Sequence, residues 1–371
     1  MAEEEPKGLI AEWWDAIEPR STLLVIGVLL LQMGFILSYV GAFHAPTPQS
    51  VLVAVVAQPR AAATQLADRL NGLSGAPLKA TVVADEATAR QRIRNDDTSG
   101  ALIVTPNPAP GTADRLLVAS AGGPAVATAI QEVITQVDAA QHRTITVEDV
   151  VPTQSGDARG LTGFYLVVGW IVGGYLVAAL LGVAKGSRPA TFRRAGLRLI
   201  ALVPYAIVSG FGGALIVGRV LGAETGHTLA LWGIGTLLVL SAATVTMAFQ
   251  VLFGVVGIGI TVLIFVVLGN PSAGGAYQPS LLPPFWRALS NALPNGAGTD
   301  GVRRIVYFDA HGIAMYLVVL AAYAVGGAIV TLIAAYVLHR RKNGNNGGNS
   351  VTGPTSRTPE SLDGPKRFAQ A

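Results

Sequence analysis

Long stretches without a charged residue constrain this chain more than any other feature. Asp, Glu, Lys and Arg are absent from five apolar segments: residues 22–43, 163–184, 199–218, 227–269 and 313–338. About 20 apolar residues, rising about 1.5 Å each, are enough to cross the roughly 30 Å hydrocarbon core of a bilayer. Charged residues make up 13% of the whole chain, against about 25% in soluble domains. The sequence therefore predicts a polytopic α-helical membrane protein that has the lipid bilayer as its surroundings.

The segment 227–269 is too long for one crossing. Gln250 lies near its middle, so we interpret it as two spans joined by a tight turn, which gives six spans arranged as one plus five. The first span, 22–43, could instead be a cleaved signal peptide. A signal peptide has an apolar region of only about 7–15 residues and a small-residue cleavage site. The sequence Gly41 to Ala45 is a poor cleavage site, so a retained anchor is favoured.

Basic residues next to the spans predict the topology. The loop between the second and third spans carries Lys185, Arg188, Arg193, Arg194 and Arg198, and His339 to Lys342 follow the last span. By the positive-inside rule both segments are cytoplasmic, and four crossings between them keep them on one side. Both termini are then cytoplasmic. Arg outnumbers Lys and Ala and Gly are abundant, as in a GC-rich bacterial genome, so we expect a bacterial plasma membrane protein.

The segment 44–162 reads as an α/β domain facing outward. Short apolar or alternating runs predict strands at 51–57, 78–83, 101–104, 115–119 and 144–150. Helices are predicted at 61–70, after the capping residue Asp85, and at 124–140 after Pro124. Glu86 and Arg90 are spaced for a favourable i, i+4 pair. The resulting order, β-α-β-α-β-β-α-β, is typical of a compact α/β domain.

The two ends of the chain differ from this core. Residues 1–21 contain Trp13 and Trp14 on one apolar helical face, and Trp prefers the membrane interface. We expect a cytoplasmic interfacial helix, with a disordered tail as the alternative. Residues 339–371 are basic at first and then rich in Gly, Asn, Ser and Thr, a composition typical of a disordered tail.

The five-span membrane domain, 163–338, contains a Pro- and Gly-rich segment at 270–312 that we expect to be an outer loop. Irregular backbone at membrane depth must be buried in protein or line a cavity, and exposed apolar side chains here would be costly. A re-entrant or interfacial hairpin at the outer mouth is one interpretation and an ordinary extracellular loop is the other. The residues that carry the candidate outer-mouth loop are Asn270, Pro271, Gly274, Gly275, Pro283, Pro284, Phe285 and Trp286.

Chemistry-bearing patterns are scarce. The chain has no cysteine and no G-x-x-x-x-G-K-[ST] segment, and its five histidines are scattered. We therefore expect no enzyme activity, no cofactor and no metal site. The sequence pI of about 9.4 reflects basic residues beside spans, so no nucleic-acid partner is expected. A charge at a helix centre is costly and is kept where ions are moved; the uncharged spans disfavour a secondary, proton-coupled exporter.

The arrangement resembles the type-2 ABC exporter permeases, in particular a branch that includes phage-infection-protein-like bacterial membrane proteins, many of unknown function. The resemblance covers about residues 9–340. It is carried by Gly269 to Gly275 with Leu281 to Trp286, by Leu293 to Gly296 and on to Arg303, and by Gly156 to Leu161 leading into Phe164 and Tyr165.

The resemblance implies an export permease that works as a homodimer or heterodimer with a separate cytoplasmic ATPase. In such permeases the interfacial helix and the first cytoplasmic loop meet the ATPase, which makes Trp13, Trp14, Arg188, Arg193 and Arg194 the candidate docking residues. The function we expect is outward movement of an amphipathic or lipid-like substrate. The alternative is a non-transporting membrane scaffold or surface receptor that acts through the outer domain.

Overall fold

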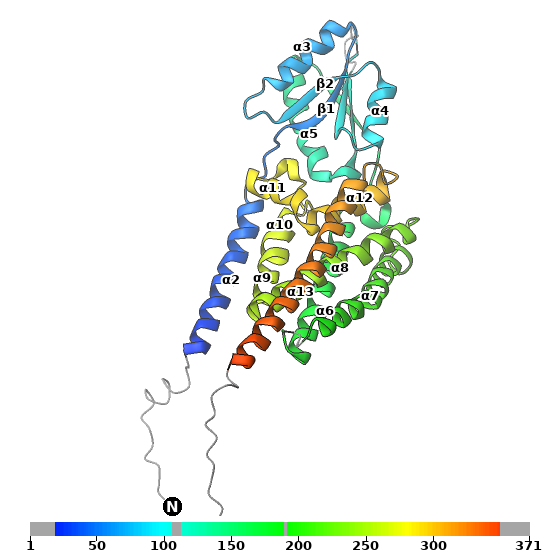
Figure 1. Cartoon of the computed structure of the whole chain (residues 1–371). Helices are drawn as coiled ribbons and strands as arrows, with labels where there is room; N and C mark the ends of the chain where they lie inside the picture. Colours follow the sequence, from blue (N-terminus) through cyan, green and yellow to red (C-terminus); the bar gives the residue numbers. More distant parts are fainter. Residues whose placement is uncertain (1–18, 106–112, 189–190, 349–371) are drawn as a thin grey trace, which may run out of the picture.

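A computed structural model describes residues 19–105, 113–188 and 191–348. The chain is mostly helical, with one five-stranded α/β region at one end and a group of long apolar helices below it (Figure 1). Trp13 and Trp14, and with them the expected interfacial helix, lie outside the described residues. The prediction of a mostly helical chain that combines apolar helices of membrane-spanning length with an α/β region is confirmed.

The α/β region has the predicted order of strands and helices. Its sheet runs β2-β1-β3-β4-β5, with β1 parallel to β2 and β3, β4 antiparallel to β3, and β5 parallel to β4. The elements are β1 (Val51–Val56), α3 (Arg60–Asn71), β2 (Leu78–Val82), α4 (Glu86–Arg94), β3 (Gly100–Ile103), β4 (Asp114–Val118), η1 (Ser120–Gly122), α5 (Pro124–Ala139) and β5 (Ile145–Asp149).

Alternation along the strands divides the core of this region between the two faces of the sheet. Val51, Val53 and Val55 pack with α3 and α5 on one face, and Ala54 packs with α4 on the other. Asp85 begins α4 by accepting a hydrogen bond from the Thr88 N–H at 2.8 Å, as predicted. The sequence pattern was therefore sufficient to specify the elements and which faces they bury.

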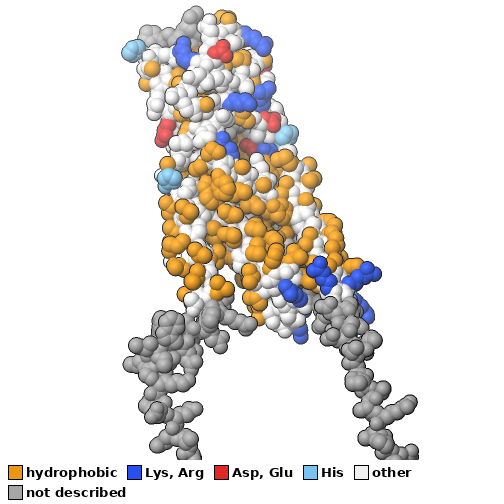
Figure 2. Space-filling model, turned by 60° about the vertical axis from the view of Figure 1, so that its left-hand side comes forward, with side chains coloured by type: hydrophobic (Ala, Val, Ile, Leu, Met, Phe, Trp, Pro, Cys, Tyr) orange, Lys and Arg blue, Asp and Glu red, His pale blue; other side chains and the backbone are white. Residues whose placement is uncertain are grey.

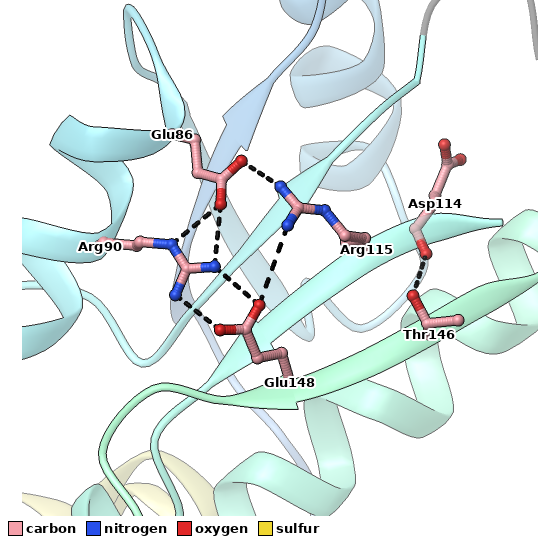
Figure 3. Close-up of polar contacts among 6 residues, drawn as sticks. All are labelled: Glu86, Arg90, Asp114, Arg115, Thr146 and Glu148. Atoms are coloured by element: carbon pink, nitrogen blue, oxygen red, sulfur yellow. Dashed lines mark hydrogen bonds and ion pairs between the residues drawn. The ribbon is translucent and has the colours of Figure 1, made fainter.

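An ion-pair cluster ties α4 to the edge of the sheet (Figure 3). Arg90 donates to Glu86 at 2.9 Å, confirming the predicted pair, and donates to both carboxylate oxygens of Glu148 on β5 at 2.7 Å. Arg115 on β4 pairs with the same two carboxylates. The cluster is partly exposed, so its role is to hold α4 in place rather than to supply chemistry.

Five helices are long and apolar enough to cross a membrane, counted over the described residues. Helix α2 (Pro19–Phe43) is the first, and α6 (Thr162–Lys185), α7 (Phe192–Leu215), α8 (Thr228–Phe253) and α13 (Ala314–Gly348) are the others. The 3-10 turn η2 (Ser155–Asp157) precedes α6, and α7 continues into the π-helical segment η3 (Ile216–Val220). Helix α8 packs against α6, α7 and α13, whereas α2 stands apart from them (Figure 1).

The predicted turn within 227–269 exists, but at Gly254 rather than near Gln250. Gly254 ends α8 with a φ of 67°, a conformation that glycine adopts readily. The chain then continues as α9 (Val256–Val262), the π-helical η4 (Leu263–Gly269) and α10 (Asn270–Ser272). Together these form a shorter apolar helix, Val256–Ser272, which contacts α2.

The segment 270–312 is more ordered than a Pro/Gly-rich outer loop. It contains η5 (Pro279–Leu281), α11 (Pro284–Ala292) and α12 (Pro294–Tyr307). Proline is well accommodated at a helix start, where its missing N–H has no intrahelical partner, and Pro284 and Pro294 begin α11 and α12. The glycines of α12 permit close approach: a Cβ on Gly298 would lie 2.7 Å from the Leu238 side chain. The same composition that predicts a loop therefore builds a tightly packed helix.

Charge separates the two ends of the helix group (Figure 2). Hydrophobic side chains cover the middle of the visible face, and Lys and Arg gather at the end remote from the sheet. The turn after α8 lies at that end, since Arg188 donates to the Leu252 carbonyl at 3.2 Å. Helix α13 continues to Gly348, so residues 339–348 are helical where composition predicts a disordered tail; an unbroken helix propagates one hydrogen bond per added residue.

Candidate functional site at the junction of the α/β region and the helices

The last two turns of α12 gather charged and phenolic side chains directly beneath the α/β region. Asp300, Arg303, Arg304 and Tyr307 lie within two turns of helix, so they share neighbouring faces. Their partners come from segments far away in the sequence.

Arg304 connects this helix to the α/β region. Its Nη2 lies 2.8 Å from the Asp96 carboxylate in the loop after α4, and its Nη1 donates to the His311 carbonyl at 2.8 Å. The guanidinium also stacks over the Tyr316 ring, 5.5 Å from the centroid. Burial raises the pKa of Asp96 to about 6, and the nearby Arg304 opposes that rise.

Arg303 and Asp300, both on α12, form a second ion pair. This pair is more buried than the pair of Arg304 and Asp96. Arg303 pairs with Asp300 and donates to the Gly274 carbonyl at 2.9 Å, which fixes α12 to the segment after α10. Burial raises the pKa of Asp300, with the two arginines opposing that rise. An arginine can make this double contact because its guanidinium presents several donors in a fixed plane.

Tyr307 links α12 to the entry of α6. Its hydroxyl donates to Asp157 at 2.8 Å, and the other oxygen of Asp157 accepts from the Thr162 N–H at 2.9 Å. Asp157 is buried and caps the start of α6 through that second bond. Burial, followed by the hydrogen bond to Asp157, raises the pKa of Tyr307, so the phenol remains a donor.

Glu224 is the most unusual member of the group. It lies in the connection between η3 and α8, is 2% exposed, and its Oε2 has no hydrogen-bond partner among the described residues. Burial raises its pKa to about 8, the neighbouring Asp157 adds to the rise, and Arg303 and the Gly163 N–H oppose it. Glu224 is therefore largely protonated at neutral pH.

Glu224, Asp157, Arg303 and Tyr307 surround a cavity of about 10 Å³ together with Phe164 and Thr299. That space accommodates about one water molecule, which is too little for an organic substrate. The described members include no nucleophile with an adjacent base. The arrangement instead suits a mechanical connection, in which one protonatable side chain sets how tightly the elements pack.

The candidate docking arginines lie together at the opposite, basic end. Arg193 and Arg194 are exposed in the first turn of α7, where Thr191 caps the helix by accepting from the Arg194 N–H at 3.2 Å. Arg188 is exposed beside the end of α8. Arg198 donates to the Lys185 and Gly186 carbonyls and so closes the loop. The structure brings Arg188, Arg193 and Arg194 to one end of the helix group, and it does not test what binds there.

The candidate outer-mouth residues divide between buried and exposed positions. Asn270, Pro271, Gly274, Gly275 and Trp286 are buried, Pro283 is partly buried, and Pro284 and Phe285 are exposed. Trp286 packs with Leu282 against Ala42 at the end of α2, while Leu281 joins the core of the α/β region. These residues lie where α2, the segment 270–312 and the α/β region meet, and we call this contact the seam. They do not line a common cavity.

A close backbone approach completes the seam. Gly123, at the start of α5, has a φ of 140°, and a Cβ there would lie 2.0 Å from the Gln278 side chain. Glycine is favoured here because a φ of 140° strains residues with a Cβ, and a Cβ would also displace the end of the Gln278 side chain. Gly275 similarly admits the Phe164 ring, 2.5 Å from where its Cβ would lie. In the described structure, Gly274 and Gly275 thus serve close packing.

Sequence reasoning missed the junction because its members are far apart in the chain. In the sequence Asp157 and Arg303 fall only within segments that carry the family resemblance, and no local pattern points to Arg304 or Glu224. One signal was present: Asp300, Arg303, Arg304 and Tyr307 follow each other at helical spacing, but the Pro- and Gly-rich surroundings indicated a loop instead.

No family model matches the chain, and neither a curated protein nor a solved structure is detectably similar to it.

Proposed function

We propose that this chain is the membrane permease subunit of an ABC-type exporter, which moves an amphipathic or lipid-like substrate outward with a separate cytoplasmic ATPase and works as a dimer in a bacterial plasma membrane. One observation carries the proposal. The helix group has an exposed basic end, and its opposite end is held to the α/β region through α12. A movement of the helices at the basic end is therefore passed to the α/β region.

The six-span topology with both termini cytoplasmic is part of this proposal. The turn after α8 lies beside the basic loop, and Gln278, shortly after α10, meets the α/β region at Gly123. Helix Val256–Ser272 therefore runs between the two ends, and at about 1.5 Å per residue it is about 25 Å long. A slightly short helix spans by local thinning of the bilayer.

The absence of cysteine makes this topology directly testable. We expect single cysteines at Ser74 and Ala276 to react with a membrane-impermeant maleimide on intact cells. Cysteines at Ala184 and Val255 are expected to react only after permeabilisation, because the proposal puts them on the cytoplasmic side. All four positions are exposed in the structure, and the unaltered chain is a label-free control. Equal labelling of Val255→Cys and Ala276→Cys would show that Val256–Ser272 does not cross.

The transport role predicts an ATPase partner. We expect the full chain to co-purify with a Walker-motif ATPase whose activity rises in its presence, and reconstituted vesicles to move lipid-like substrate only with ATP. Charge reversal at Arg193 and Arg194 should reduce the ATP-dependent movement by at least tenfold, since both guanidinium groups are exposed at the basic end. Arg92→Glu with Arg94→Glu, on exposed residues of α4, is the matched control. Reconstitution with neither an ATPase partner nor ATP-dependent movement would exclude the exporter.

The second candidate is a non-transporting membrane scaffold or surface receptor that acts through the outer domain. A cavity of about 190 Å³ in the α/β region favours it. In that case the protein's biological function survives charge reversal at Arg188, Arg193 and Arg194, and is lost on changes confined to residues 50–155.

A further inference from the structure

The cavity of about 190 Å³ lies where the strand order of the sheet reverses. From β1 the chain goes by α3 to β2 on one side, and then by α4 to β3 on the other side of β1. Residues that follow the carboxyl ends of β1 and β3, Ala57 and Val104, line the cavity. In open α/β sheets this crevice outside the carboxyl ends of the strands, at the switch point, is where ligands bind.

The floor of the cavity holds two buried carboxylates in different states. Asp114, 1% exposed, is satisfied: it accepts from Arg143 Nε at 2.6 Å and from the Thr105 N–H at 3.0 Å. Asp138, 3% exposed, is not: its Oδ2 has no hydrogen-bond partner in the described part of the chain. A buried acceptor without a partner is costly, so Asp138 is a position where a bound donor group would be stabilised.

The rim carries the opposite charge. Arg69 on α3 lines the cavity, is exposed, and makes no ion pair among residues 19–105, 113–188 and 191–348. With Asp114 and Arg143 paired to each other, one acid at the floor and one base at the rim remain uncompensated. A bare divalent cation would not use Arg69, and a simple anion would be repelled by Asp138. A small molecule that carries both an ammonium and a carboxylate satisfies both.

The remaining wall is mixed. Gln65 and Gln141 contribute amide groups. Ala57, Ala62, Leu66 and Val104 contribute aliphatic surface beside Asp138. Since one water occupies about 30 Å³ in the liquid, the cavity has room for a solute of roughly six water volumes. That size suits a free amino acid with an aliphatic side chain.

We propose that the α/β region binds a free aliphatic α-amino acid in this cavity, with its ammonium on Asp138, its carboxylate on Arg69 and its side chain against the aliphatic part of the wall. Burial and the nearby Asp114 raise the pKa of Asp138 to about 6, and Arg143, which is paired with Asp114, opposes that rise. The site does not depend on transport, and its test does not use an ATPase.

Calorimetric titration of the full chain in nanodiscs at pH 7.5 tests the site with three matched probes. L-Leucine carries both charged groups, 3-methylbutylamine lacks the carboxylate, and 4-methylpentanoate lacks the ammonium. We expect L-leucine to bind tightest, the amine to bind about tenfold more weakly, and the acid to bind weakest, because it leaves the buried Asp138 unpaired.

Two variants separate the ends of the ligand. Arg69→Gln should weaken L-leucine about tenfold and leave 3-methylbutylamine unchanged, whereas Asp138→Asn should weaken both. Arg60→Gln, at the exposed start of the same helix, is the matched control and should change nothing. Arg69 is exposed, so Arg69→Gln should fold even if Asp138→Asn does not. The binding of the three probes to Arg69→Gln is therefore a sufficient test of the proposal by itself. No L-leucine binding at millimolar concentration, or binding that Arg69→Gln leaves intact, would overturn the proposal.

Discussion

Replacing Glu224 by Gln should stabilise the protein at alkaline pH and remove the part of the pH dependence of its stability between about pH 5 and 8 that this carboxyl contributes. The ordinary pKa of this carboxyl is 4.5, and burial beside Asp157 raises it to about 8 in the folded chain. Between those values the folded state holds a proton that the unfolded state releases. The contribution of Glu224 to stability is therefore complete below pH 4.5 and is lost as the pH rises towards 8.

The size of the effect follows from the same shift. At about 1.4 kcal/mol per pKa unit, the accumulated loss above pH 8 is up to about 5 kcal/mol, and relaxation around the ionised group reduces it. Gln cannot ionise and preserves the shape of the protonated carboxyl. Unfolding midpoints in nanodiscs from pH 5 to 9 measure the difference. Glu132→Gln, an exposed position on α5, is the control. Parallel pH profiles for Glu224→Gln and the unaltered chain would contradict the burial of this charge.

Local patterns predicted the α/β region well because its elements are specified locally. The apolar run of β1, the Asp85 cap and the Glu86 to Arg90 spacing each require only residues within one or two turns. The register between β3 and β4 and the ion pairs to Glu148 required the fold itself. The apolar helices were equally evident, since length and absence of charge are read directly from the chain.

The segment 270–312 shows where such patterns fail. Pro and Gly indicate turns in a soluble protein, yet Pro284 and Pro294 begin helices and Gly298 permits the close approach of Leu238. Which role applies depends on what packs against the segment, and that comes from helices more than 50 residues away. The junction charges were missed for the same reason, as Arg304 acquires its meaning only from Asp96.

The junction and the amino-acid cavity occupy different parts of the fold, which separates the functions proposed for them. Helix α5 connects them: its start contacts Gln278 through Gly123, and its end supplies Asp138. The cavity and the contact at Gln278 therefore share one helix.

The ion pair between Arg304 and Asp96 is a polar link between the α/β region and α12, and its removal should weaken the attachment of the two parts. Both side chains are largely buried, 15% and 28% exposed. Arg304→Met keeps the length of the side chain but leaves Asp96 without its cation. Removing one partner of a buried pair costs about 3–5 kcal/mol, and we expect about 2–3 kcal/mol here because Asp96 is partly exposed.

The loss should depend on pH in a defined direction. With Arg304 present the pKa of Asp96 is about 6; without it the pKa rises further, since the opposing charge is gone. Arg304→Met is therefore most destabilising near pH 8 and much less so near pH 5, where Asp96 takes up a proton. Asp96→Asn combined with Arg304→Met should recover part of the loss, with a coupling energy of about 1–3 kcal/mol. Arg92→Met, exposed on α4, is the control for loss of a cation. A coupling energy near zero, or equal losses at pH 5 and pH 8, would show that the α/β region is held to α12 by apolar packing alone, and the junction would then have no role for its charges.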